Sequence, residues 1–287
     1  MNLLVTGSNG QLGREIKKIS TNFPEFNMFY SDMDTLNICD KNAVLSYFKK
    51  NDINCVINCA AYTNVDEAES NFKSANDVNN IGVSNLVDAC LKNNSIIIHI
   101  STDYVFDGNK KSPYLETDMT NPIGVYGKTK FFGEKCITDS KVRGIVIRTS
   151  WLYSLFGNNF VNTILKLSEE KKSIKVVNDQ FGSPTNAADL ATACMKILKK
   201  LKNPGIQNSK IYHFSNLGYC SWYEFAKSII SFSKKNCSVL PVPTSEFKTK
   251  AQRPKFSVLD KQKIMYDFSI EIPTWQNSLK IYFSKLS

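Results

Sequence analysis

The chain has 287 residues, of which 42% are hydrophobic and 22% charged, and its formal net charge is +10. This composition is typical of a globular protein and excludes a disordered one, and the length suits one two-lobed unit or two small domains. No apolar run reaches the roughly 18–20 residues that a membrane helix needs, and a strand-like segment follows the first two residues, leaving no room for a signal peptide. We therefore expect a cytoplasmic protein that does not contact a membrane.

Charge, cysteine and histidine usage exclude further function classes. The basic residues are spread along the chain, and several close predicted helices, where they complement the helix dipole. A solvated basic surface explains them better than nucleic-acid binding, so we expect no nucleic-acid partner. The eight cysteines form no Cys-x-x-Cys pair, which indicates buried, reduced thiols. His99 and His213 lack metal-ligand partners at a recognisable spacing, so we expect no metal site.

Apolar runs alternate with amphipathic stretches along the first 150 residues, which is typical of a parallel sheet with crossover helices. The predicted strands there are residues 3–6, 27–31, 56–59, 95–100 and 144–148, and the predicted helices are 11–20, 41–50, 74–93 and 126–138. Beyond them, helices are predicted at 159–171, 186–200, 222–231 and 274–286, strands at 174–177 and 211–214, and proline-marked loops at 241–243 and 253–254.

This pattern predicts an α/β fold with a doubly wound parallel (Rossmann) sheet and a smaller C-terminal substrate-binding lobe. The dinucleotide-binding domain is expected to comprise residues 1–150 and a return segment at about 186–214. The lobe is expected to comprise residues 151–185 and 215–287.

A glycine-rich turn follows the first predicted strand and opens the first helix. Its glycines allow a tight turn, a close approach of the backbone to phosphate and close packing of helix on strand. The amides at the start of the helix then face a dinucleotide pyrophosphate. The expected cofactor contacts in this turn are Gly7, Asn9, Gly10, Gln11, Leu12 and Gly13.

The ends of the next two strands supply further cofactor contacts. Asp32 follows the second strand, where a carboxylate accepts the ribose 2′-hydroxyl and favours NAD. Ser31 beside it and Arg14 suit a 2′-phosphate instead, so the choice between NADH and NADPH stays open. After the third strand, small residues let a cofactor lie across the strand ends; the expected contacts are Ala60, Ala61 and Thr63.

Ser101-Thr102-Asp103 and Tyr126-x-x-x-Lys130 carry the expected chemistry. Reduction of a ketone needs a hydride at carbon and a proton at oxygen. Tyr126 and Lys130 share one helix face, where an ammonium lowers the pKa of the phenol and makes it a better acid. Thr102 follows the fourth strand, where a hydroxyl can donate to a substrate carbonyl.

Together these motifs resemble the extended short-chain dehydrogenase/reductase superfamily, and longer strings resemble its dTDP-4-dehydrorhamnose reductase family. The strings are Ala60-Ala61-Tyr62-Thr63-x-Val65-Asp66-x-Ala68-Glu69, Ser101 to Gly108, Tyr126 to Glu134, Arg148 to Tyr153, Gly157 to Phe160, Asp179 to Thr185, and Arg253-Pro254. The match runs nearly end to end, and the strings after Trp151 are the most specific.

The resemblance implies reduction of the C4 ketone of a dTDP-4-keto-6-deoxy-L-mannose by NADPH or NADH. It implies Thr102, Tyr126 and Lys130 as the catalytic residues. The implied substrate contacts are Asp103, Tyr104, Trp151, Asn158, Asn159 and Arg253. Asn37 and Ile38 are expected beside the adenine, although the family usually carries Asp where this chain has Asn37.

Two alternatives stay open at this point. One is another nucleotide-sugar reductase or epimerase of the same superfamily, which shares the cofactor motifs. The other is a non-catalytic partner protein that resembles the regulatory subunit of methionine adenosyltransferase. The complete set of Thr102, Tyr126 and Lys130 favours a catalyst. For the oligomeric state, the homodimer is the hypothesis that we carry forward for testing.

Overall fold

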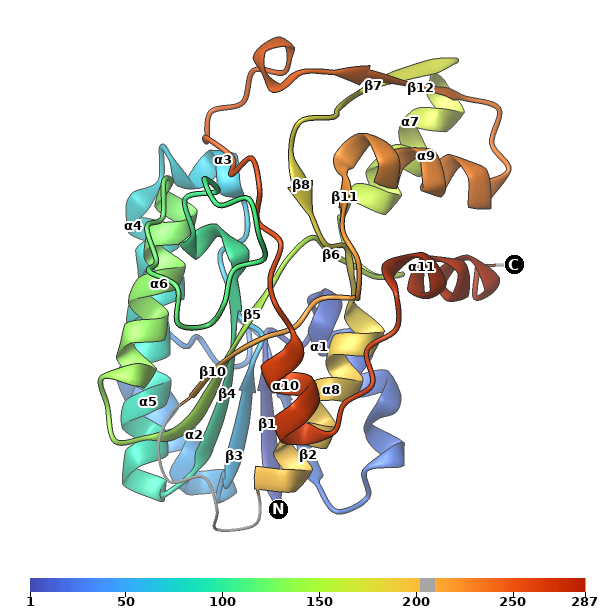
Figure 1. The fold of residues 1–287 in the computed structure, drawn as a ribbon. Coiled ribbons are helices and arrows are strands. Elements are labelled where there is room, and N and C mark those ends of the chain that lie inside the picture. The colour runs from blue at the N-terminus through green and yellow to red at the C-terminus, as the bar shows by residue number, and fades with distance from the viewer. Residues whose placement is uncertain (202–209, 287) are drawn as a thin grey trace.

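The computed structural model describes residues 1–201 and 210–286, and its centre is a parallel sheet (Figure 1). Among the described residues this sheet has six strands in the order β10-β5-β4-β3-β1-β2, and every neighbouring pair is parallel. The strands are β1 (Asn2–Thr6), β2 (Asn27–Ser31), β3 (Cys55–Asn58), β4 (Ile96–Thr102), β5 (Arg143–Thr149) and β10 (Lys210–His213).

Helices cover both faces of this sheet. On one face lie α1 (Gln11–Ile19), α8 (Ala187–Leu201) and α10 (Gln262–Phe268); on the other lie α2 (Lys41–Asn51), α5 (Gly82–Asn93) and α6 (Val125–Thr138). Successive strand residues point to opposite faces, so a strand covered on both sides is apolar throughout. In β3, Cys55 and Ile57 join the core under α8, whereas Val56 joins the core under α5.

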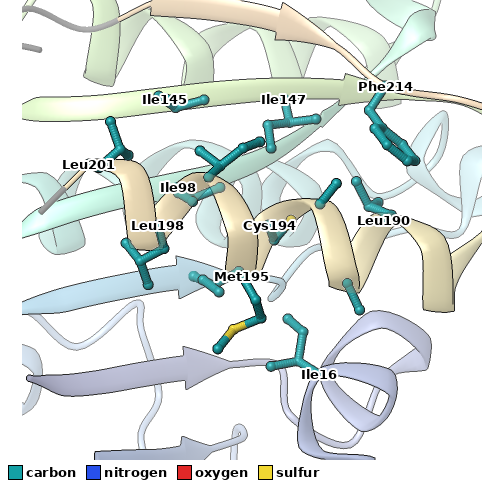
Figure 2. Close-up of a cluster of buried hydrophobic side chains, with 14 of the residues drawn as sticks. Ile16, Ile98, Ile145, Ile147, Leu190, Cys194, Met195, Leu198, Leu201 and Phe214 are labelled. Atoms are coloured by element: carbon teal, nitrogen blue, oxygen red, sulfur yellow. The ribbon is translucent and has the colours of Figure 1, made fainter. Parts of the chain in front are cut away.

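The larger of these cores lies between β4, β5 and α8. Figure 2 shows Ile98, Ile145 and Ile147 of the sheet in one cluster with apolar side chains of α8. The clustered side chains of α8 include Leu190, Cys194, Met195, Leu198 and Leu201. Burial of each such aliphatic side chain contributes about 1.5–3 kcal/mol, so this interface holds α8 firmly on the sheet.

A smaller lobe lies beyond the carboxyl ends of the central strands, at the top of Figure 1. Its core is formed by aromatic and aliphatic side chains, among them Tyr153, Phe225 and Trp275. Its helices are α7 (Phe160–Glu170), α9 (Trp222–Ser233) and α11 (Trp275–Ser284). Its strand pairs are β7 (Ser173–Val177) with β12 (Ser238–Val242), β8 (Phe181–Gly182) with β11 (Cys220–Ser221), and β6 (Leu152–Tyr153) with β9 (Thr185–Asn186).

The remaining elements are short. They are α3 (Val65–Ala68), α4 (Phe72–Asn76), the π-turn η2 (Asp77–Ile81) and the 3₁₀ turns η1 (Ser20–Asn22), η3 (Asp103–Val105) and η4 (Thr244–Glu246). The predicted helix at 74–93 is therefore interrupted by η2. The interruption turns Asn79 inward, where its side chain binds both the backbone N–H and the carbonyl of Tyr62.

Two other predictions of secondary structure were wrong. Residues 241–243 were expected to form a loop, but Pro241 lies in β12, opposite Val176 of β7. Proline is tolerated there because a two-stranded sheet consists of edge strands. The helix α10 was not predicted. The other predicted helices and strands are confirmed to within three residues at their ends.

The predicted division into domain and lobe stays a prediction, but the structure shows where its segments pack. The return segment holds α8, which packs on α1, and β10, which pairs with β5. In the C-terminal segment, α10 packs on α8 and β10, and the core of the main sheet includes Ile264, Phe268, Ile270 and Ile272. No helix within residues 1–201 and 210–286 combines the length and apolar character needed to cross a bilayer.

Candidate active site

A cleft with a volume of about 1100 Å³ opens between the carboxyl ends of the central strands and the smaller lobe. From β1 the chain first adds β2 on one side and then returns to add β3 on the other side. The connections to these two strands run in opposite directions and leave a crevice at the carboxyl ends of the strands, and the cleft lies there. Of the predicted site residues, those that line it are Gly7, Gly10, Gln11, Leu12, Asp32, Asn37, Ile38, Ala60, Ala61, Thr63, Thr102, Asp103, Tyr104, Tyr126, Lys130, Trp151, Asn158 and Arg253. Asn9, Gly13 and Asn159 are not among the lining residues.

The glycine turn has the geometry that a dinucleotide requires. Gly7 has a φ of +61°, which only glycine adopts freely, and a Cβ there would lie 2.6 Å from the backbone nitrogen of Ala60. A Cβ on Gly13 would lie 2.5 Å from the Cα of Ser8, so this glycine lets helix and strand pack closely. Gly10 is the N-cap of α1 and carries no capping side chain, and the first turn has no acidic residue. The helix start can therefore receive an anionic pyrophosphate.

Substitution of Gly7 by alanine is expected to lower the free energy of unfolding by roughly 2–5 kcal/mol. The cause is twofold: alanine is strained at this left-handed φ, and its Cβ would clash with the backbone of Ala60. Gly10→Ala is the matched control, because Gly10 has a φ of −74° and a Cβ there meets only the Gly7 carbonyl, at 3.2 Å. We expect the control to stay within roughly 1 kcal/mol of the wild type. Urea denaturation without added cofactor measures both, and equal losses would contradict the argument.

Asp32 places a carboxylate at the end of β2, on the wall of the cleft. Its Oδ2 accepts from the backbone N–H of Asn9 at 2.9 Å, and its Oδ1 accepts from the N–H of Met33 at 2.8 Å. Ser31 and Arg14, the two residues that suited a 2′-phosphate, do not line the cleft: Ser31 is fully buried, and the Arg14 guanidinium lies over the Phe156 ring. Asp32 is thus the charged side chain that the fold presents where a ribose would lie.

Thr102 and Tyr126 meet at the floor of the cleft. Thr102 ends β4 and caps η3, accepting from the backbone N–H of Tyr104 at 3.2 Å and donating to Asp103 Oδ1 at 3.0 Å. Burial raises the pKa of the Tyr126 phenol to about 12, and a hydrogen bond with Thr102 opposes this rise. Burial likewise raises the pKa of Asp103 to about 6. The phenol is therefore protonated at neutral pH and can act as a proton donor.

Lys130 lies one helical turn beyond Tyr126 and is almost completely buried. Its Nζ donates to the carbonyl oxygen of Ile100 at 2.6 Å and lies 3.5 Å from Nε2 of His99. Burial lowers the pKa of Lys130 to about 8. The pKa of Tyr126 is thus raised rather than lowered as expected from Lys130, because burial of the phenol dominates.

Arg253 lines the cleft and forms an ion pair with Asp66. Its two terminal nitrogens donate to the Oδ atoms of Asp66 at 2.8 and 3.2 Å, and Asp66 also accepts from the N–H of Ala251. This bidentate pair ties the 251–253 loop to α3. Asp66 stood in one of the family-like strings, but nothing in its spacing indicated Arg253 as its partner.

Trp151 borders the cleft by its edge. It has a φ of +48°, and its ring is stacked on Trp222 at 3.4 Å between centroids. A Cβ on Gly182 would lie 2.5–2.7 Å from three neighbouring ring atoms, which places that glycine against the opposite ring face. Asn159 instead caps α7 and donates to Gln11 Oε1 at 3.1 Å.

Several lining residues were not predicted as site residues. They include Met33, Leu36, Cys59, Tyr62, Val65, Ser101, Ser150, Phe160 and Trp222. Most of them are the immediate neighbours of a predicted residue in the chain, so their position next to these motifs could have indicated them. Val65 and Trp222 are the exceptions, and only the folded lobe brings Trp222 to Trp151.

The comparison with known families agrees with this geometry. The family model described as the RmlD substrate binding domain matches residues 1–287. The chain belongs to the RmlD family. The resemblance found in the sequence is therefore confirmed.

Other RmlD proteins match over nearly their whole length. A dTDP-4-dehydrorhamnose reductase of Aggregatibacter actinomycetemcomitans is 39% identical over 284 residues, 97% of each chain. The crystal structure of a dTDP-4-dehydrorhamnose reductase of Clostridium acetobutylicum has a TM-score of 0.93 at 39% identity and covers 100% of this chain and 99% of that one. A dTDP-4-dehydrorhamnose reductase of Bacillus anthracis in complex with NADP has a TM-score of 0.92 at 37% identity, covering 99% of each chain.

Proposed function

We propose that this protein reduces the C4 ketone of dTDP-4-dehydro-6-deoxy-L-mannose to dTDP-L-rhamnose with NADPH or NADH, the last step of dTDP-rhamnose synthesis. The observation that carries the proposal is the meeting of Thr102, Tyr126 and Lys130 with the glycine turn in one cleft. Membership of the RmlD family supports this substrate over other nucleotide sugars.

The nicotinamide cofactor supplies the hydride to the carbonyl carbon when it is bound. Gly7, Gly10 and the start of α1 would hold its pyrophosphate, and Asp32 would accept a hydrogen bond from its adenine ribose. Asn37 and Ile38 would contact the adenine, and Ala60, Ala61 and Thr63 would complete the cofactor site; all five residues line the cleft.

Tyr126 gives its phenolic proton to the developing alkoxide, and the Thr102 hydroxyl turns its one proton from Asp103 to donate a hydrogen bond to the same oxygen. Lys130 would hold the nicotinamide ribose, and its charge would oppose the effect of burial on the Tyr126 phenol. A protein group that stabilises charge only as it develops accelerates the reaction rather than merely binding the substrate.

The substrate side of the cleft is formed by Asp103, Tyr104, Trp151, Asn158 and Arg253. Arg253 contacts the substrate diphosphate in this proposal, with Asp66 orienting its guanidinium. Asn159 acts indirectly, since it joins the start of α7 to Gln11. We further propose that the enzyme works in the cytoplasm, on a nucleotide sugar, as a homodimer.

The deciding experiment follows oxidation of NADPH and of NADH with enzymatically generated dTDP-4-dehydro-L-rhamnose. We expect consumption of the cofactor together with formation of dTDP-L-rhamnose, and the two rates give the cofactor preference. Protein purified with tightly held NAD and showing no net consumption would point to an epimerase. Stable co-purification with a synthetase, without reductase activity, would point to a regulatory partner.

A further inference from the structure

His99 is a buried titratable side chain directly behind the candidate catalytic residues. It lies in β4, has no exposed surface, and its Nε2 is 3.5 Å from Nζ of Lys130. Burial and the charge of Lys130 hold the pKa of His99 well below its ordinary value. The imidazole is therefore neutral and carries one proton, and the nitrogen that bears this proton decides what Lys130 meets.

Asn58 of β3 determines the tautomer. Its Oδ1 lies 3.2 Å from the backbone nitrogen of Ala60, which can only donate, and 2.6 Å from the hydroxyl of Thr6. The amide oxygen therefore lies on this side, and Nδ2 faces Nδ1 of His99 at 3.0 Å. Since an amide nitrogen only donates, Nδ1 of His99 accepts and carries no proton. The proton is on Nε2, the nitrogen that faces Lys130.

An N–H directed at Nζ disfavours an ammonium, which has three donors and no acceptor, and favours an amine, whose lone pair can accept. Both the ammonium and the neutral amine of Lys130 can donate the hydrogen bond from Nζ to the carbonyl oxygen of Ile100. We propose that Asn58 and His99 position the side chain of Lys130 and limit the pH up to which it carries the charge that acts on Tyr126. His99 is then a positioning residue that acts through Lys130. This inference rests on the role given to Lys130 in the proposed function.

The other groups around Lys130 act on the same equilibrium. Burial lowers the pKa of Lys130 to about 8, whereas Glu134, one turn further along α6, and Cys59 after β3 favour the ammonium. Glu134 is itself held by Arg148 of β5 in an ion pair of 2.7 Å. Tyr126, one turn earlier in α6, stays neutral below its pKa of about 12. The two forms of Lys130 are thus close in free energy near neutral pH, where one directed N–H changes their ratio.

The tautomer can be read directly, because the chain has two histidines. Nδ1 of His213 lies 3.2 Å from the carbonyl oxygen of Tyr114, and its Nε2 lies 3.5 Å from a nitrogen of Arg148, which can only donate. His213 therefore carries its proton on Nδ1, the opposite of His99. We expect long-range ¹H–¹⁵N spectra of the full chain, labelled at histidine, to show one ring of each tautomer. The His213→Gln variant assigns the two signals.

The functional consequence is tested with His99→Gln. The amide of glutamine can turn its oxygen towards the ammonium, so Lys130 should keep its proton to higher pH. We expect the alkaline fall of kcat to move upward by roughly one pH unit. His213→Gln is the matched control, since it removes an equally buried histidine of the same sheet away from Lys130, and its alkaline fall should not move.

A protonated Nδ1 on His99, or an alkaline fall that stays in place in His99→Gln, would overturn the inference. The spectrum needs neither substrate nor cofactor, so it remains decisive if the variant does not fold. It also separates the two proposals. A protein without reductase activity but with the expected tautomers contradicts the proposed function, whereas an active reductase with the wrong tautomer contradicts the role of His99.

Discussion

Replacement of Tyr126 by phenylalanine is expected to lower kcat by a factor of roughly 10²–10⁴, the usual loss when a general acid is removed. The phenol lines the cleft and is protonated at neutral pH, and the variant keeps the ring that packs edge-on against Tyr104 at 5.7 Å. Cofactor affinity, followed by nicotinamide fluorescence, should therefore change little. The loss should appear in the rate of product formation under saturating cofactor.

The control for this experiment is Tyr212→Phe. The Tyr212 hydroxyl donates to Asp267 at 2.8 Å in the core of the main sheet and does not line the cleft. Its loss should affect stability and leave kcat near the wild-type value. A Tyr126→Phe enzyme with a turnover within a few-fold of the wild type would remove Tyr126 from the role of acid.

Arg148→Met is expected to lower the free energy of unfolding by about 3–5 kcal/mol, because it leaves the buried carboxylate of Glu134 without its ion-pair partner. Arg148 donates to both carboxylate oxygens, at 2.7 and 2.9 Å, and the two side chains are only 2% and 1% exposed. Urea denaturation gives the difference directly. The double variant Glu134→Leu/Arg148→Met removes both charges and should recover most of the loss.

A surface pair provides the contrast. Lys135 and Asp139 form an ion pair of 2.7 Å with side chains that are 50% and 57% exposed. Because solvent screens such pairs, Lys135→Met should cost at most about 1 kcal/mol. Equal losses in Arg148→Met and Lys135→Met would show that burial does not govern the cost of breaking the Glu134 pair.

Most of the central sheet could be predicted because its strands are buried on both faces. Such strands are continuous apolar runs, as in residues 96–98, and glycine and helix-cap residues mark their ends. The residues of the cleft could be predicted for the same reason, since the carboxyl ends of parallel strands meet at one edge of the sheet.

What could not be predicted depends on partners distant in the chain. Residues 238–242 form a strand only because β7 lies beside them, and Pro241 and the adjoining Pro243 argue for a loop when the segment is considered alone. The pairing of Arg253 with Asp66 joins residues 187 positions apart. The effect of burial on Tyr126 likewise depends on surroundings that no local pattern describes.

The packing of residues 264–272 against the main sheet has a consequence for how the chain acquires its structure during synthesis. The apolar side chains of this segment complete the core beside α8 and β10, yet the segment leaves the ribosome after nearly all of the smaller lobe, and only α11 follows it. The hydrophobic core on the α8 side of the sheet therefore cannot close on a nascent chain that ends before this segment. A protein shortened just ahead of α10 should emerge with apolar surface uncovered on the sheet and accumulate in inclusion bodies, even though every residue of the cleft is still present.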